Sequence, residues 1–207
     1  MIGTLPLSAS LPQGTRFIPM EDSSTEGRLL VIGIETPHST IRHMARAKVR
    51  NVARIVLGTV LDCRPEAVHL ISHPGQPLRL ISPSQSIGLS VSHETGFSLM
   101  AINFHGAVGV DLMRLDDQFE WASDSELVAH DYLGKHVSAK IANEPAERRQ
   151  KVFADKWTAF EASLKCNGLP LSEWDAVRDQ SLNECRTIAL KLQGNMVGTV
   201  AIFKEIP

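Results

Sequence analysis

The sequence predicts a mixed α+β fold for this chain of 207 residues. The first indication is a stripe of apolar side chains at helical spacing, formed by Phe153, Trp157, Phe160 and Leu164. The second is a series of short apolar runs between residues 68 and 104, separated by Pro, Gly and Ser turns. Such runs are typical of strands in an antiparallel or mixed sheet. Helices and short strands therefore both contribute to the core.

Composition excludes several classes of protein. Hydrophobic residues make up 43% and charged residues 21% of the chain, which is ordinary for a globular domain. A net charge of −2 gives no reason to expect a nucleic acid partner. No stretch approaches the roughly 18 apolar residues of a membrane span, and residues 1–17 lack the features of a signal peptide. The three cysteines are scattered, which argues against a disulfide framework and favours the cytoplasm.

The first part of the chain predicts two strands, at 15–18 and 29–34, and then a helix with a basic face. Arginines recur at every fourth position of this helix, at 42, 46, 50 and 54, and valines at 49, 52, 56 and 60 form the opposing apolar stripe. The arginines are either a solvated face or a docking face for anions, namely phosphates or an acidic partner helix.

Four further strands are expected at 68–71, 78–81, 87–91 and 97–104. Turns are predicted at 94–96 and 105–106, where glycine is present. His93 is expected to follow a strand and to precede the first of these turns. A strand at 107–110 ends, in this interpretation, at Asp111.

The remaining segments predict two helices and a closing hairpin. Residues 123–126 form a capping-box pattern that starts a helix running to Tyr132. Pro145 suits a first helical turn, so the long helix is expected to begin near Asn143 and to stop at residues 167–168. Strands at 186–192 and 196–203 flank Gln193-Gly194-Asn195 and form the hairpin.

Charged residues on the long helix are candidates for a functional site. Glu161 and Lys165 lie four residues apart and therefore share one helix face. Taken alone, they are a surface ion pair that contributes about 0.3–0.5 kcal/mol. Two other features accompany them, the Ser92-His93 pair and the run Gly109-Val110-Asp111.

In this order and at this spacing, these three features resemble the 4′-phosphopantetheinyl transferases, in particular the larger, pseudo-dimeric type exemplified by the surfactin-synthetase activator. That family carries a Ser-His motif, a Gly-Val-Asp strand and a helix with the pattern W-x-x-K-E-x-x-x-K. The last pattern corresponds to Trp157, Glu161 and Lys165 here. The resemblance covers residues 41–171.

The resemblance implies two similar α/β lobes in a pseudo-twofold arrangement, residues 1–105 and 106–207, with the ligand site between them. It implies an enzyme that moves 4′-phosphopantetheine from coenzyme A to a serine of an acyl or peptidyl carrier protein. Mg²⁺ would be held by Asp111 and Glu161, and Lys165 would join these two residues in catalysis. Coenzyme A would contact Lys165 and four residues of the first lobe, Arg46, Arg50, Ser92 and His93. A monomer is expected.

Three positions depart from the family pattern. Met113 replaces a frequent third carboxylate, although part of the family has Met there and a water is thought to complete the metal's coordination. Phe160 replaces the lysine before the catalytic glutamate, and Gly75-Gln76-Pro77 replaces Gly-Lys-Pro.

Two other functions stay open at this point. The chain is alternatively a non-catalytic relative that binds coenzyme A or a carrier protein, an idea supported by Met113 and Phe160. It is alternatively an unrelated Mg²⁺-dependent phosphohydrolase with Asp111 and Glu161 as ligands. A carrier protein distinguishes the functions, because only the transferase needs one as acceptor.

Overall fold

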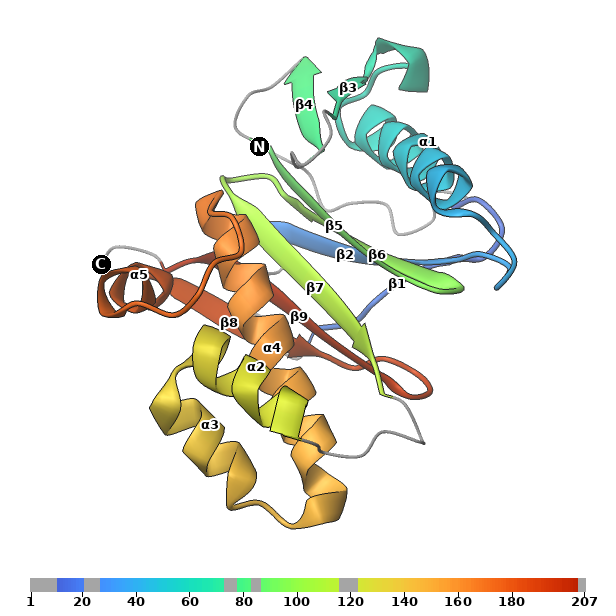
Figure 1. Cartoon of the computed structure of the whole chain (residues 1–207). Helices are drawn as coiled ribbons and strands as arrows, with labels where there is room; N and C mark the ends of the chain where they lie inside the picture. Colours follow the sequence, from blue (N-terminus) through green and yellow to red (C-terminus); the bar gives the residue numbers. More distant parts are fainter. Residues whose placement is uncertain (1–10, 21–26, 73–77, 83–86, 116–122, 205–207) are drawn as a thin grey trace. The chain divides into compact units, whose positions relative to one another are not determined.

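The computed structural model describes residues 11–20, 27–72, 78–82, 87–115 and 123–204. It confirms the mixed α+β class, since helices and antiparallel sheets alternate along the chain (Figure 1). The chain divides into two compact units, Met1–Val108 and Gly109–Pro207. The lobe boundary expected at residues 105–106 lies just before this division.

The first unit is built on a four-stranded antiparallel sheet. Its strands, in spatial order, are β1 (Thr15–Phe17), β2 (Leu29–Glu35), β6 (Phe97–Asn103) and β5 (Gly88–Glu94). A separate antiparallel pair is formed by β3 (His69–Ile71) and β4 (Arg79–Ser82). The helix α1 (Arg42–Val60) lies over the sheet (Figure 1), and a 3-10 turn, η2 (Pro65–Ala67), follows it.

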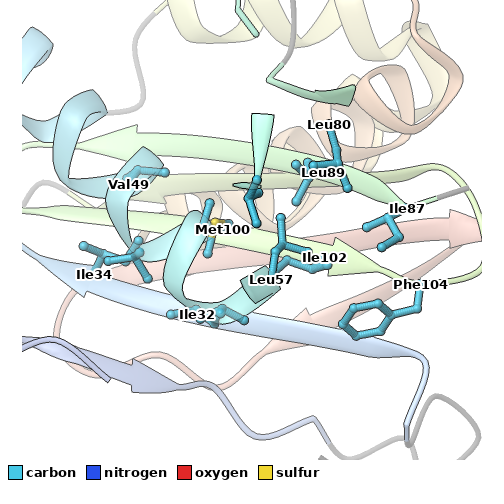
Figure 2. Packing of buried hydrophobic residues seen from close by; sticks show 14 residues of the cluster. Ile32, Ile34, Val49, Leu57, Leu80, Ile87, Leu89, Met100, Ile102 and Phe104 are labelled. Carbon is cyan, nitrogen blue, oxygen red and sulfur yellow. The ribbon is translucent and has the colours of Figure 1, made fainter. Parts of the chain in front are cut away.

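The core of the first unit lies between α1 and this sheet (Figure 2). Val49, Val52 and Val56 of α1 are buried against β2 and β6, where Ile32 and Met100 are inaccessible to solvent. Each such side chain contributes about 1.5–3 kcal/mol relative to an exposed one. The predicted valine stripe is thus the buried face of α1. Packing of this face leaves Arg42 and Arg46 exposed, and Arg50 and Arg54 half-buried.

A tight hairpin joins β5 to β6. Glu94 pairs with Phe97 and His93 with Ser98, so only Thr95 and Gly96 form the loop. Gly96 has a φ of 82°, a left-handed conformation that glycine adopts without strain. The expected turn is present, but His93 lies within β5 rather than after it. Pairing with β6 continues to Glu94 because the loop is so short.

The second unit consists of a three-stranded sheet with helices. The strand order is β7 (Val108–Arg114), β9 (Met196–Phe203) and β8 (Cys185–Leu190). The long helix α4 (Ala146–Asn167) packs across β9 and β8, and α2 (Ser123–Leu133) and α3 (Lys135–Ala142) lie beside it (Figure 1). A short helix, α5 (Ala176–Leu182), precedes β8. The predicted hairpin is confirmed as β8 and β9, whereas α3 and α5 were not predicted.

The predicted and observed bounds of α4 agree at the C-terminal end of the helix and differ at its N-terminal end. The helix begins at Ala146, with Pro145 in an extended N-cap conformation, while Asn143 caps α3 instead. The predicted start near Asn143 is therefore wrong, because a second helix occupies that segment. At the other end Gly168 takes φ 67° and ψ 24°, and the Leu169 N–H donates to the Leu164 carbonyl. The predicted stop is thus a glycine-terminated helix end.

Small residues form the face of α4 that packs on the sheet. Ala154, Thr158, Ala162 and Cys166 recur at every fourth position and are buried. An added Cβ at Gly109 of β7 would lie 1.8 Å from the Ala162 carbonyl oxygen. The glycine of the Gly109-Val110-Asp111 run is therefore required by the close approach of the β7 and α4 backbones.

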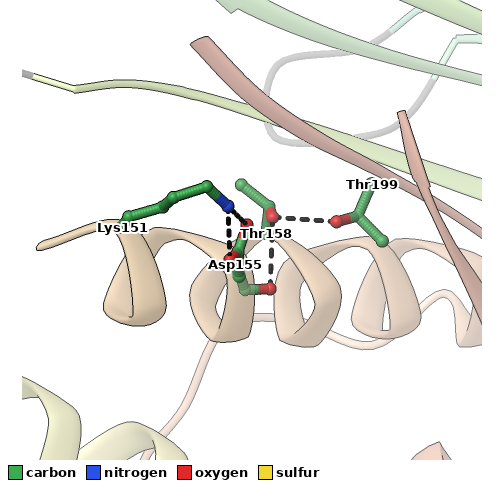
Figure 3. Close-up of polar contacts among 4 residues, drawn as sticks. All are labelled: Lys151, Asp155, Thr158 and Thr199. Atoms are coloured by element: carbon green, nitrogen blue, oxygen red, sulfur yellow. Dashed lines mark hydrogen bonds and ion pairs between the residues drawn. The ribbon is translucent and has the colours of Figure 1, made fainter. Parts of the chain in front are cut away.

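A buried pair of hydroxyls links α4 to β9. The hydroxyls of Thr158 and Thr199 are 2.9 Å apart, and the former also reaches the Asp155 carbonyl (Figure 3). Both threonines are buried, and in the described part of the chain the Thr199 hydroxyl depends on Thr158 for its partner.

Replacing one member of this pair is expected to destabilise the second unit. Thr158→Val should cost about 1–3 kcal/mol, because it leaves the Thr199 hydroxyl buried without its partner. Chemical denaturation should show a smaller cost for the Thr158→Val/Thr199→Val double substitution than for the sum of the two singles. Thr59→Val is a suitable control, since the Thr59 hydroxyl is exposed and donates to the Ile55 carbonyl of its own helix. Strict additivity in the double variant would contradict the coupling.

Candidate functional site

The structure brings Asp111 of β7 together with Glu161 and Lys165 of α4. Lys165 Nζ donates to Asp111 Oδ1 at 2.6 Å and to the Val110 carbonyl at 3.2 Å. The same nitrogen lies 3.5 Å from Glu161 Oε2. One ammonium group therefore bridges two carboxylates that are distant in the sequence.

Local structure explains this convergence. Side chains alternate along a strand, so Asp111 shares with Gly109 the side of β7 that faces α4. Glu161 and Lys165 are one helical turn apart and point the same way. Asp111 is not at the end of its strand, as predicted, but in the middle, because β7 continues to Arg114. Pairing with β9 on one side extends the strand and fixes the direction of the Asp111 carboxylate.

The site is partly shielded from solvent and carries an excess of negative charge. The side chains of Asp111, Glu161 and Lys165 are 7%, 25% and 30% exposed. Burial, and then the negative charge of Asp111, raise the pKa of Glu161, while Lys165 and a hydrogen bond with Trp157 act in the opposite direction. Two carboxylates sharing one ammonium group favour a further cation.

An aromatic cluster supports the α4 turns that carry Glu161. Trp157 stacks on Phe153 at a centroid distance of 5.6 Å and meets the edge of Tyr132 at 5.8 Å. Phe160 and Met113 pack on the same cluster, which also includes Ile141 of α3. Met113 and Phe160, two of the three positions that depart from the family pattern, thus have a role in packing.

The donor set fits Mg²⁺. Mg²⁺ prefers oxygen ligands and is usually held by one or two carboxylates, with water and substrate phosphates completing its octahedral shell. Asp111 and Glu161 supply two carboxylates of this kind. In the described part of the chain no group of three or more His, Cys, Asp or Glu side chains gathers at one point.

The other predicted ligand residues belong to the first unit. Ser92 and His93 lie on β5, with Ser92 buried and His93 half-buried. His93 Nδ1 is 2.7 Å from the hydroxyl of Ser98. Arg46 is exposed on α1, and Arg50 donates to the Ser72 hydroxyl at 3.1 Å. Gly75, Gln76 and Pro77, and the acidic residues Asp116, Asp117 and Glu120, are outside the described residues.

The second unit also has a recess of about 270 Å³, which is not lined by Asp111, Glu161 or Lys165. Its walls include Lys156, Phe160 and Ser163 of α4 together with Trp174. Lys156 and Ser163 are on the opposite side of the helix from Glu161 and Lys165, at 100° per residue. The charged cluster is therefore distinct from this recess, and its chemistry identifies it as the candidate site.

Sequence reasoning missed two residues near the candidate ligands. Ser98 gave no signal, because a single serine in an apolar run is common. Gly109 was read only as part of a motif, although a glycine before a buried carboxylate indicates a close backbone approach.

The fold and the charged cluster define a mixed α+β protein with a carboxylate–ammonium site suited to phosphate chemistry. No family model matches the chain. It is similar to a candidate 4′-phosphopantetheinyl transferase of Synechocystis sp. (strain PCC 6803), with 27% identity over 60% of this chain and 49% of the relative. It is also similar to the 4′-phosphopantetheinyl transferase HetI of Nostoc sp. (strain PCC 7120), with 29% identity over 58% of this chain and 49% of the relative.

The chain thus spans about half the length of the curated relatives it matches. Both relatives carry the name of the family that the sequence motifs resemble. No helix in the described part of the chain combines the length and apolar character that a membrane span requires.

Proposed function

We propose that this protein transfers 4′-phosphopantetheine from coenzyme A to a serine hydroxyl of an apo carrier protein. The products are the holo carrier protein and 3′,5′-ADP. The observation that carries the proposal is the Asp111–Lys165–Glu161 cluster, formed by the strand and helix that bear the motifs. The similarity to two proteins named as such transferases supports it.

The reaction is a phosphoryl transfer, in which positioning and neutralisation of charge dominate. The serine oxygen attacks the β-phosphorus of the coenzyme A pyrophosphate, and the bond from that phosphorus to the bridging oxygen breaks. 3′,5′-ADP leaves with the electron pair of that bond. Mg²⁺, when bound by Asp111 and Glu161, supplies neutralising charge for the pyrophosphate.

The residues of the cluster have complementary roles in this proposal. Asp111 is held in place by Lys165, and Lys165 presents a point charge to the phosphates. Glu161 acts as metal ligand, as acceptor of the serine proton, or as both. Ser92, His93, Arg46 and Arg50 are proposed to contact the phosphates or the pantetheine arm of coenzyme A.

The arginine face of α1 provides a separate prediction. Arg46→Ala/Arg50→Ala is expected to raise the KM for coenzyme A, or for the carrier protein if this face docks it, by about tenfold. Arg54→Ala is the matched control on the same helix and should change both KM values less. Steady-state kinetics with each substrate varied in turn provides the measurement. Two unchanged KM values would show that the arginines form only a solvated face.

The finer features of the family are part of the same proposal. The protein is proposed to be of the larger type, which has two similar lobes in a pseudo-twofold arrangement. It is also proposed to act as a monomer and to be cytoplasmic.

Mass spectrometry of an apo carrier protein tests the proposal. The purified chain, coenzyme A and Mg²⁺ should add the mass of one phosphopantetheine to the carrier, and chelation of the metal should prevent the addition. A non-catalytic relative would bind coenzyme A without adding mass. A phosphohydrolase would release product from coenzyme A in the absence of any carrier. Because Met113 and Phe160 pack in the aromatic cluster, their apolar character does not by itself favour lost catalysis.

A further inference from the structure

A cross-strand pair in the β5–β6 hairpin joins a candidate phosphate ligand to a buried hydroxyl. His93 of β5 lies directly opposite Ser98 of β6, and the distance from His93 Nδ1 to the Ser98 Oγ is 2.7 Å. The Ser98 side chain is inaccessible to solvent, with 0% exposure, whereas His93 is half-buried. Ser98 therefore contacts the ring from the interior of the first unit.

The chemistry of this contact selects one form of the imidazole. A buried hydroxyl needs an acceptor for its proton. Among the residues that the structure describes, the Ser98 hydroxyl makes no hydrogen bond other than the one to His93. Ser98 therefore donates to Nδ1, which accepts through its lone pair. The single proton of the neutral ring then resides on Nε2.

Packing alone does not explain a serine at this position. In β6 the neighbouring residues Leu99, Met100 and Ala101 are all apolar and fully buried. A hydroxyl placed among such side chains costs desolvation free energy that only a hydrogen bond offsets. His93 is the partner that receives this hydrogen bond. The role of the Ser98 hydroxyl is therefore to contact the His93 ring.

We propose that Ser98 is a positioning residue, which holds His93 in the tautomer with the proton on Nε2 so that the ring donates to a phosphoryl oxygen. The inference rests on the proposed function, because coenzyme A supplies the phosphate ester or pyrophosphate oxygen. An N–H donor attracts a phosphate oxygen, whereas the opposite tautomer would direct a lone pair at it and repel it. Ser98 thus contributes to binding of the anion without touching it.

The first measurement is nuclear magnetic resonance of the imidazole nitrogens in ¹⁵N-labelled protein. The His93 signals are assigned by their loss in His93→Gln, and their shifts distinguish the two neutral tautomers. The unsubstituted protein is expected to show a protonated Nε2 and an accepting Nδ1. Ser98→Ala should move both signals towards a mixture of tautomers, and Ser98→Thr should restore them, since threonine keeps the hydroxyl. This spectrum does not depend on any transfer activity.

The second measurement is the Kd for coenzyme A in the presence of Mg²⁺. Ser98→Ala should raise the Kd about two- to tenfold, the effect of one lost hydrogen bond, and Ser98→Thr should recover affinity. Ser163→Ala is the matched control, because Ser163 is a buried serine of α4 whose hydroxyl bonds to its own helix. It should change neither the His93 spectrum nor the Kd.

Several outcomes would overturn the inference. One is an Nδ1–H tautomer of His93 in the unsubstituted protein, which requires no variant to fold. Another is an unchanged His93 spectrum or an unchanged Kd in Ser98→Ala. An unaltered Kd in His93→Gln would also contradict it, because the ring would then not meet the ligand. Absence of transfer to a carrier, with these spectra and affinities as expected, would instead contradict only the proposed function.

Discussion

Asp111→Ala and Glu161→Ala are each expected to lower the rate of phosphopantetheine transfer by on the order of a hundredfold or more, with the fold retained. Both carboxylates are proposed metal ligands and contact Lys165, so loss of either would remove a ligand and leave one fewer negative charge. The two side chains differ from core residues in that they bond to a partly exposed lysine. Circular dichroism should therefore remain close to that of the unsubstituted protein.

Initial rates with excess Mg²⁺ provide the measurement. Asp155→Ala is the matched control, because Asp155 is a carboxylate of the same helix that pairs with Lys151 in a solvent-exposed ion pair (Figure 3). This substitution should leave the rate within about twofold, since such pairs contribute at most about 1 kcal/mol. Near-normal turnover by either Asp111→Ala or Glu161→Ala would exclude the assignment of both residues to the metal.

Gly109→Ala is expected to have the largest effect on stability. The added methyl group would lie 1.8 Å from the Ala162 carbonyl oxygen and 2.6 Å from the Cys166 backbone nitrogen. Backbone atoms of a helix cannot move aside as a side chain does, so β7 and α4 must separate. Overpacking of this kind costs about 3 kcal/mol or more, at the upper end of the usual range. The separation should also move Asp111 away from Lys165 and lower transfer activity.

Thermal denaturation should show a decrease in Tm of about 6–12 °C for this cost. Gly33→Ala, in β2 of the first unit, is the matched control, because its methyl group would meet the Phe97 ring and the end of the Ile18 side chain. Side chains can adjust, so the control should lose less stability. Equal losses in the two variants would argue against the special closeness of β7 and α4.

Much of the secondary structure follows from local pattern. The valine stripe of α1 is buried, the stop at Gly168 ends α4, and β8 and β9 form the expected hairpin. Each of these features depends on residues within a turn or two of one another, so the sequence contains the whole cause. Boundaries were less predictable, as the start of α4 shows, because a helix of eight residues such as α3 spans too few turns to establish an apolar period in the sequence.

The candidate site illustrates a second kind of prediction. Asp111, Glu161 and Lys165 were selected by a resemblance of motifs, and the structure places all three within one cluster. The resemblance therefore implied phosphate chemistry at these residues, but no local pattern related a strand residue to a helix more than forty residues later.

The sequence by itself determined the α+β class, most of the elements, and the charged residues available for chemistry. Tertiary structure decided which of these residues meet. The approach of α4 to β7 depends on the absence of a side chain at Gly109 and on the small residues Ala162 and Cys166 of the helix. The tautomer of His93 depends on a hydroxyl that faces it only through pairing of β5 with β6. Such contacts arise from the volumes and polar groups of segments that come together only in the folded chain, and local periodicity carries no information about them.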